Sequence, residues 1–254
     1  MTGTVTDIYR YPVKGLSGEK LEELALKSGQ TVPGDRLYAL GRPGFHFDTD
    51  NPAWMPKTNF LALVRDSRLA ELTTQYDDAT SVLTVVRHGQ TVLSARLSER
   101  SGRDSLEAFF EDFMGHDISG RPTLLRAEVH SFSDLDAKVV SLINLDSVRD
   151  LAARTGQTID PIRFRANLYF EGLTAWRELD WVGQVLKAGS VRLKVIKRTQ
   201  RCAATNVNPT TAQRDMNIPA VLQKNWGHTD LGIYARVVTG GRIRPGDRLT
   251  LEND

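Results

Sequence analysis

Cysteine is nearly absent from this chain: Cys202 is the only one in 254 residues. One thiol cannot form an intramolecular disulfide, a zinc site built from several cysteines or an iron–sulfur cluster, and the five histidines lack zinc-type spacing. Cys202 can be a buried small hydrophobe, a catalytic nucleophile or one soft ligand to a metal that brings its other ligands with it. The choice among these roles decides most of the functional interpretation.

An excess of charge of one sign is also missing. Lys and Arg total 33 and Asp and Glu total 31, so the formal net charge of +2 excludes a polycation that coats nucleic acid. No apolar run approaches the roughly 20 residues that span a bilayer, and residues 1–7 lack the basic and apolar regions of a secretory signal. We expect a cytoplasmic protein whose partners include neither nucleic acid nor a membrane.

Short apolar or alternating segments, separated by turn residues, predict strands along most of the chain. They cover residues 5–11, 21–26, 36–40, 69–75, 81–86, 90–94, 167–170, 191–196, 231–238 and 248–251. Apolar residues at helical spacing predict helices over 106–114 and 144–154, ended by Gly115 and Gly156. The pattern predicts an α+β, mostly β fold. We divide it into a β-barrel-like part, residues 1–105, and a β-rich part with a few helices, residues 106–254.

Five short motifs occur in a fixed order. They are Ile8-Tyr-Arg-Tyr-Pro-Val-Lys-Gly15, Gly34-Asp-Arg-Leu-Tyr38, Arg163-Phe-Arg-Ala-Asn167, Gln200-Arg-Cys202, and Gly232-Ile-Tyr234 with Ile243-Arg-Pro-Gly-Asp-Arg-Leu249. In this order the chain resembles the MOSC family, named for the C-terminal domain of molybdenum cofactor sulfurase, with its N-terminal β-barrel. Within the family it is similar to the amidoxime-reducing component group.

The resemblance implies a site for the molybdenum cofactor, Mo-molybdopterin, whose metal is ligated by the Cys202 thiolate. It also implies that the anionic pterin and its phosphate are held by Lys14, Gly15, Arg36, Arg163, Arg165, Asn167 and Arg201. Asn144 and Leu145 belong to a helix-entry loop, residues 141–147, that contacts the phosphate in the family. Because a Leu side chain donates no hydrogen bond, backbone N–H groups at the helix start would have to serve there.

The chemistry of the residues agrees with this resemblance. The cofactor brings a dithiolene and oxo groups to molybdenum, so one soft thiolate from the protein completes the coordination sphere. Arg198 and Arg201 flank Cys202, and nearby cations favour the thiolate form that a metal requires. A phosphate needs Arg or Lys contacts, and the basic residues named above would have to converge in the fold.

Other roles for the same residues stay open. Cys202 can be a structural thiol, or a nucleophile with His228 as its base, although no nucleophile-elbow pattern surrounds it. Lys14 and Arg36 can be solvated charges at strand ends, and Arg165 to Asn167 an ordinary strand start. Trp54 and Trp226 are candidates for aromatic residues that line the substrate face.

The predicted function is a molybdenum-dependent enzyme that reduces N-hydroxylated substrates such as amidoximes, hydroxylamines and N-hydroxylated bases. Cys202 holds the metal, and Asp230 and His228 are candidate proton donors. Because one cysteine cannot hold a ferredoxin-type cluster, electrons come from a separate flavin or iron–sulfur protein. The alternatives are a cofactor carrier or sulfur-transfer protein that uses Cys202 transiently, and a β-rich binding module that has lost the cofactor.

Overall fold

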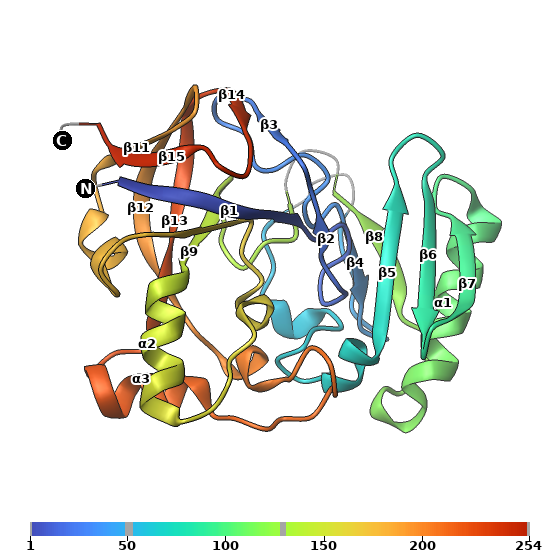
Figure 1. Cartoon of the computed structure of the whole chain (residues 1–254). Coiled ribbons are helices and arrows are strands. Elements are labelled where there is room, and N and C mark those ends of the chain that lie inside the picture. The colour runs from blue at the N-terminus through green and yellow to red at the C-terminus, as the bar shows by residue number, and fades with distance from the viewer. Residues whose placement is uncertain (1, 49–52, 128–130, 253–254) are drawn as a thin grey trace.

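The computed structural model describes residues 2–48, 53–127 and 131–252, and its largest feature is a closed β-barrel (Figure 1). Around the barrel the strands follow in the order β10 (Leu168–Glu171), β9 (Val140–Asn144), β13 (Asp230–Thr239), β12 (Val191–Gln200), β11 (Val185–Ala188), β15 (Arg248–Leu251) and β1 (Thr2–Arg10). Strand β1 closes the barrel because it pairs with both β15 and β10. All the neighbouring pairs are antiparallel except β9–β10.

Alternating burial explains why these segments form a barrel. In β12 the side chains of Val191, Leu193 and Val195 are buried in the barrel core, whereas Lys194 between them is exposed. The same period of two buries Ile233, Ala235 and Val237 in β13 and exposes Arg236. Strand β9 differs, since all five of its residues are buried. It is covered on both faces, as strands of parallel pairs commonly are.

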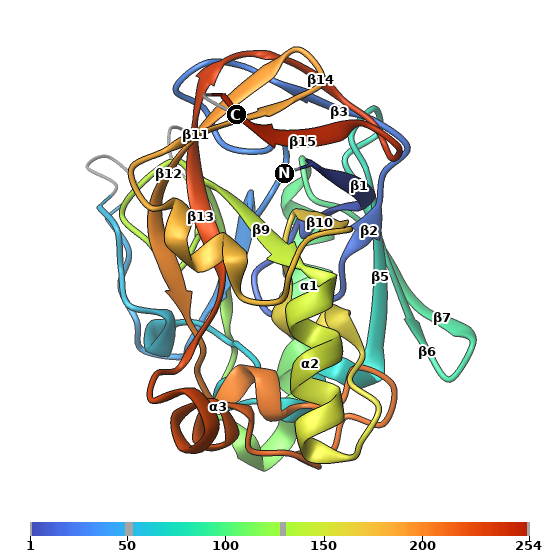
Figure 2. The same cartoon turned by 60° about the vertical axis from the view of Figure 1, so that its left-hand side comes forward.

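Smaller sheets lie beside the barrel, and most of their strands come from residues between β1 and β9. Strands β5 (Leu72–Asp77), β6 (Val82–Arg87) and β7 (Gln90–Arg96) form an antiparallel sheet that packs with α1 (Arg100–Met114) through a separate apolar core. Strand β4 (Tyr38–Gly41) pairs with β8 (Thr123–Arg126), β3 (Leu24–Leu26) with β14 (Gly241–Ile243), and β2 (Glu19–Lys20) with β1. Figure 2 shows the sheet of β5, β6 and β7 projecting from the side of the barrel.

Two further α-helices lie at one end of the barrel, α2 (Leu145–Thr155) and α3 (Ile218–Trp226). The Asn144 side chain caps α2 by accepting a hydrogen bond from the Asp146 N–H, and Gly156 ends it in the left-handed conformation, with φ 66°. The short 3₁₀ helices are η1 (Lys57–Asn59), η2 (Ser67–Glu71), η3 (Gly115–Asp117), η4 (Pro161–Phe164), η5 (Arg177–Trp181) and η6 (Ala203–Asn206).

The predicted α+β, mostly β architecture is confirmed, as are the two predicted helices with Gly115 and Gly156 at their ends. Residues 141–147 do not form a loop: β9 runs to Asn144 and α2 begins at Leu145. The division near residue 105 stays a prediction. Strand β1, at the start of the chain, is part of the barrel otherwise formed by residues after 139.

A buried carboxylate joins α2 to the barrel. Glu178 in η5 is fully buried, and it accepts hydrogen bonds from Asn144 Nδ2 at 3.1 Å and from Ser147 Oγ at 2.8 Å. No lysine or arginine of the described residues forms an ion pair with it. Burial therefore raises the pKa of Glu178 above its ordinary value, while these hydrogen bonds oppose the shift.

We predict that Glu178 makes the free energy of unfolding fall as pH rises. Because the folded pKa is raised, the fold favours the protonated carboxyl. Its contribution is full below the unfolded pKa of about 4.3 and is lost as pH rises through the folded pKa. Glu178→Gln removes this dependence, so the difference in unfolding free energy between wild type and variant should decline with pH in urea titrations. A difference that is independent of pH would contradict the assignment.

Candidate functional site

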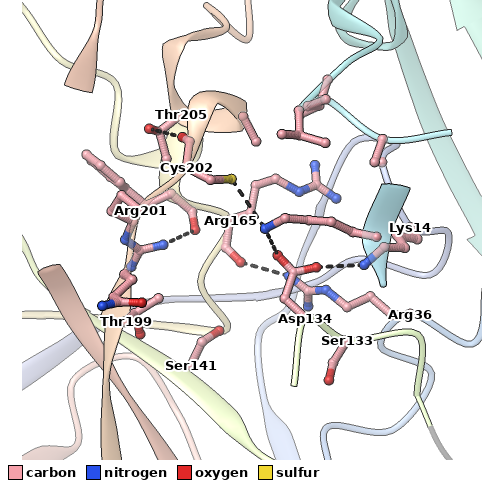
Figure 3. Close-up of a pocket in the computed structure, with 18 of the residues that line it drawn as sticks. Lys14, Arg36, Ser133, Asp134, Ser141, Arg165, Thr199, Arg201, Cys202 and Thr205 are labelled. Atoms are coloured by element: carbon pink, nitrogen blue, oxygen red, sulfur yellow. Dashed lines mark hydrogen bonds and ion pairs between the residues drawn. The ribbon is translucent and has the colours of Figure 1, made fainter. Parts of the chain in front are cut away.

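Cys202 lies two residues beyond the end of β12, at the wall of a cavity of about 110 Å³ between the barrel and the segments before it (Figure 3). The turn is held locally, because the Cys202 carbonyl accepts hydrogen bonds from the N–H of Thr205 at 3.0 Å and from its Oγ1 at 2.9 Å. The charged residues that line the cavity are the cations Lys14, Arg36, Lys57, Arg163, Arg165 and Arg201 and the anions Asp35 and Asp134. This excess of positive charge suits an anionic ligand.

A chain of charged side chains leads away from the thiol. Lys57 Nζ lies 3.4 Å from Cys202 Sγ and 3.0 Å from one carboxylate oxygen of Asp134. The other carboxylate oxygen of Asp134 lies 2.7 Å from Nζ of the buried Lys14, which also donates to the Phe132 carbonyl at 2.9 Å. Asp134 thus bridges the two ammonium groups, and its contact with Lys14 is visible in Figure 3. The thiol therefore faces a cation that is fixed by a carboxylate.

These contacts shift the pKa values of Lys14, Lys57 and Asp134. Burial alone would raise the pKa of Asp134, but the ammonium groups of Lys14 and Lys57 hold it well below its usual range. Burial lowers the pKa of Lys14, and Asp134 opposes that shift. The pKa of Lys57 is raised despite its burial, because Asp134 and Cys202 both favour the charged ammonium.

A second network fixes Arg36 and Asn167. Asp35 is buried and forms an ion pair with Arg36, whose guanidinium also donates to the Arg165 carbonyl at 3.0 Å. Asn167 Nδ2 donates to Asp35 at 3.1 Å, and Asn167 Oδ1 accepts a hydrogen bond from Ser141 Oγ at 2.8 Å. Asn167 is thereby occupied by protein partners. The Asn167 amide is therefore bound to other residues of the protein rather than free at the cavity.

Arg165 differs from the other cations of the cavity. Its guanidinium lies 4.3 Å from the centroid of the Tyr11 ring, and no described residue gives it an ion pair or side-chain hydrogen bond. Burial lowers the pKa of Arg165 to about 10, so it stays protonated at neutral pH. Its backbone is left-handed, with φ 52°, and that of Arg36 is too, with φ 50°. Such strain costs on the order of 1 kcal/mol per residue and concentrates at functional sites.

Arg163 and Arg201 lie in the cavity wall and are largely occupied. Arg163 forms a 2.8 Å ion pair with Asp215, although its Nε is buried without a partner among the described residues. Arg201 donates to the Leu231 carbonyl at 2.7 Å and to the Phe164 carbonyl at 3.0 Å. Gly15 also lines the cavity: its φ is 85°, and a Cβ there would meet the Leu61 carbonyl oxygen at 2.7 Å.

Several predicted site residues are not among those that line this cavity. Asn144 caps α2 and binds Glu178, and Leu145 packs with the apolar residues around α2 and α3. His228 Nδ1 accepts a hydrogen bond from the Asp230 N–H at 3.1 Å. The Arg198 guanidinium donates to the Leu179 carbonyl. The structure thus gives no placement that supports proton donation by His228 or Asp230, or phosphate contact by Asn144 or Leu145.

Sequence reasoning missed Lys57 and Asp134, and no motif marks either residue. Lys57 follows Trp54, whose indole N–H donates to the Ser133 carbonyl at 3.3 Å, so Trp54 lies beside the cavity. Trp226 instead packs against Trp176, with ring centroids 4.4 Å apart. Across the described part of the chain, no three His, Cys, Asp or Glu residues converge as metal ligands.

Two family models match the chain. The MOSC domain matches residues 118–250 and the MOSC N-terminal beta barrel domain matches residues 2–119. The chain therefore belongs to the MOSC family, whose domains are associated with binding of the molybdenum cofactor. The two matches meet at residues 118–119, and α1 lies within the match to the N-terminal beta barrel domain.

The solved structures that match the chain are distant in sequence. The YuaD protein from Bacillus subtilis matches 98% of this chain and 94% of its own, with 14% identity and a TM-score of 0.45. YiiM from Geobacillus stearothermophilus and YiiM from Escherichia coli each match 44% of this chain and 53% of their own. Their identities are 23% and 21%, and their TM-scores are 0.35 and 0.31. No curated protein matches the chain.

The helices of residues 2–48, 53–127 and 131–252 include none with both the length and the apolar character that crossing a membrane requires.

We predict that Asp134→Asn lowers the free energy of unfolding by about 1 kcal/mol at neutral pH, because Lys14 and Lys57 lose their shared carboxylate. The value is near the upper end for an exposed pair, since the Asp134 side chain is 42% exposed. The contribution of a carboxyl whose folded pKa is depressed is present above the unfolded pKa, about 3.9, and is lost as pH falls below it.

Urea unfolding of wild type, Asp134→Asn and Asp136→Asn at neutral pH and near pH 3 measures this effect. Asp136 is exposed and forms no ion pair with another described residue, so its variant serves as the matched control. Equal stability of the Asp134 and Asp136 variants at neutral pH would show that the bridge contributes nothing.

Proposed function

We propose that this protein binds the molybdenum cofactor and uses the Cys202 thiolate as the single protein ligand to molybdenum. The observation that carries the proposal is the position of the only thiol at a small cavity whose charged lining residues are mostly cations. A phosphate-bearing cofactor that lacks one soft ligand matches this donor set. When bound, the cofactor supplies the two-electron redox centre of the reaction.

Unpaired N–H groups of arginines that line the cavity support the binding of an anionic cofactor. Among the described residues, the Arg165 guanidinium has no ionic partner, and the buried Nε of Arg163 has no hydrogen-bond acceptor. A guanidinium is suited to bidentate contact with phosphate, and burial strengthens such contacts. Lys14 and Arg36 add positive charge, although both are already paired within the protein. Arg165 is therefore the residue that we assign to the anionic part of the cofactor.

We further propose that the protein reduces N-hydroxylated compounds, as the similarity to the amidoxime-reducing group implies. The overall change is R–NH–OH plus two electrons and two protons to R–NH₂ and water. Lys57 holds a proton at Nζ, 3.4 Å from Cys202 Sγ, and Asp134 fixes its position. Lys57 thus replaces His228 and Asp230 as the candidate proton donor beside the thiol. Electrons come from a separate flavin or iron–sulfur protein, and we assign the reaction to the cytoplasm.

A cofactor carrier or sulfur-transfer protein is the second candidate. It is favoured by the partial exposure of Cys202, which leaves the sulfur open to a second thiol or a persulfide, and by the adjacent ammonium of Lys57. Cofactor that survives extensive dialysis, together with turnover driven by a reduced dye, would favour the enzyme over the carrier.

We predict that Cys202→Ala loses nearly all bound molybdenum, whereas wild type expressed in a molybdate-supplied host holds close to one metal per chain. The reason is that no other soft donor lines the cavity. Elemental analysis of both proteins, with Arg198→Gln as the control, measures the loss. Arg198 is close to Cys202 in sequence, but its guanidinium binds the Leu179 carbonyl. Full metal content in Cys202→Ala would refute the ligand assignment.

We predict that Arg165→Gln weakens retention of the pterin by about 10-fold to 100-fold, the range expected for loss of a charged hydrogen-bonded contact. The fluorescent oxidised pterin released from each purified protein reports the retained amount without any assay of activity. Arg198→Gln again removes the same charge near Cys202 but outside the cavity lining. Equal retention in the two variants would remove Arg165 from the cofactor site.

A further inference from the structure

The outer face of the barrel carries a group of cations on three neighbouring strands, β11, β12 and β13, which Figure 2 shows side by side. Lys194 lies directly opposite Arg236 in the β12–β13 pair, and Lys187 lies opposite Arg192 in the β11–β12 pair. We call this surface the basic wall and define it as Lys187, Arg192, Lys194, Lys197 and Arg236.

Few carboxylates of the described residues lie near the basic wall. Arg192 forms an ion pair with Glu252, and Asp180 lies near Arg198 at 3.8 Å. Among the described residues, Lys187, Lys194, Lys197 and Arg236 have no carboxylate partner, and all are exposed. Like charges directly opposite each other on neighbouring strands destabilise a sheet. A ligand of opposite charge would account for keeping them there.

The basic wall leads to the Cys202 cavity. Lys197 pairs in register with Tyr234, and Tyr234 and Thr199 both line the cavity. Strand β12 ends at Gln200, two residues before Cys202. From Lys197 to Cys202 the chain spans at most roughly 17 Å at strand spacing. Lys197 therefore lies near the proposed redox centre, and the other cations continue the basic wall away from it along β11, β12 and β13.

We propose that the basic wall is the docking surface for an acidic electron-donor protein of the ferredoxin type. The inference rests on the proposed function, because a reductase whose single cysteine cannot hold a cluster needs electrons from another protein. Two reduced donors each supply one electron, and with two protons these convert one N–OH group to N–H and water. Complementary charge accelerates such transient encounters and makes them sensitive to salt.

The experiment compares wild type with Lys194→Glu, with the double variant Lys194→Glu/Arg236→Glu, and with Arg100→Glu. Arg100 is exposed at the start of α1, and its variant changes the net charge as much as Lys194→Glu does. Helix α1 lies on the opposite side of the molecule from β12 (Figure 1). Binding of an acidic [2Fe–2S] ferredoxin is measured at low and high salt. Turnover is measured with that ferredoxin and, separately, with a reduced dye.

We expect the double variant to bind ferredoxin at least tenfold more weakly at low salt, with a smaller salt dependence, while Arg100→Glu stays within about twofold of wild type. Lys194→Glu places a carboxylate opposite Arg236, so its thermal midpoint should equal or exceed that of wild type. Weaker ferredoxin binding by that variant then cannot come from unfolding. Dye-driven turnover should be unchanged in all the variants.

Equal binding of ferredoxin by the double variant and Arg100→Glu would overturn the proposal, and so would absence of binding to wild type. Wall-dependent binding of a DNA duplex or of phosphatidylserine vesicles, without binding of ferredoxin, would overturn it in favour of those ligands. Absence of dye-driven turnover in metal-loaded wild type would refute the proposed reaction. The binding measurements would still decide whether the basic wall recognises an acidic protein.

Discussion

The buried carboxylate of Asp35 connects the segment that follows β1 to the barrel and thereby positions the site. It accepts hydrogen bonds from the Tyr11 N–H at 2.8 Å and from Asn167 Nδ2 at 3.1 Å, and it forms an ion pair with Arg36. Asn167 in turn binds Ser141 on β9. This one network brings Lys14 and Arg36 from the first forty residues to the same cavity as Arg165. Because a buried charge that loses its partners is costly, these contacts favour one relative placement of the segments.

The cations of the cavity divide into two groups with different consequences. Lys14, Arg36 and Arg201 are bound to protein acceptors, so they shape the cavity and contribute charge from fixed positions. Arg165 has no such acceptor among the described residues, and the aromatic ring of Tyr11 supports its guanidinium. A partly buried cation without an acceptor is unfavourable for folding alone, which agrees with the proposed binding of an anion there. Lys57 lies between the two groups, since it contacts both Asp134 and the thiol.

The sequence contained enough to predict the mostly β architecture and the two longer helices, because alternation, helical spacing and turn residues are local signals. It also singled out Cys202, which lines the cavity, although its role as a ligand stays a prediction. Strand β9 was not predicted because its five residues are buried on both faces and show no alternation. The pairing of Lys57 and Asp134 depends on tertiary contacts between residues 77 apart. Asn144 was assigned by resemblance to the cofactor, whereas its amide binds Glu178 and caps α2. The spacing of residues in the sequence reveals neither the Lys57–Asp134 ion pair nor the contact of Asn144 with Glu178.

The central claim is that the Cys202 thiolate binds molybdenum in a cavity of fixed cations. X-ray absorption at the molybdenum edge of the metal-loaded wild-type protein tests this claim most directly, because it counts the sulfur neighbours of the metal. The account predicts one sulfur neighbour beyond those of the cofactor's dithiolene. A spectrum that requires only the dithiolene sulfurs would contradict it and would leave Cys202 with a role outside metal ligation.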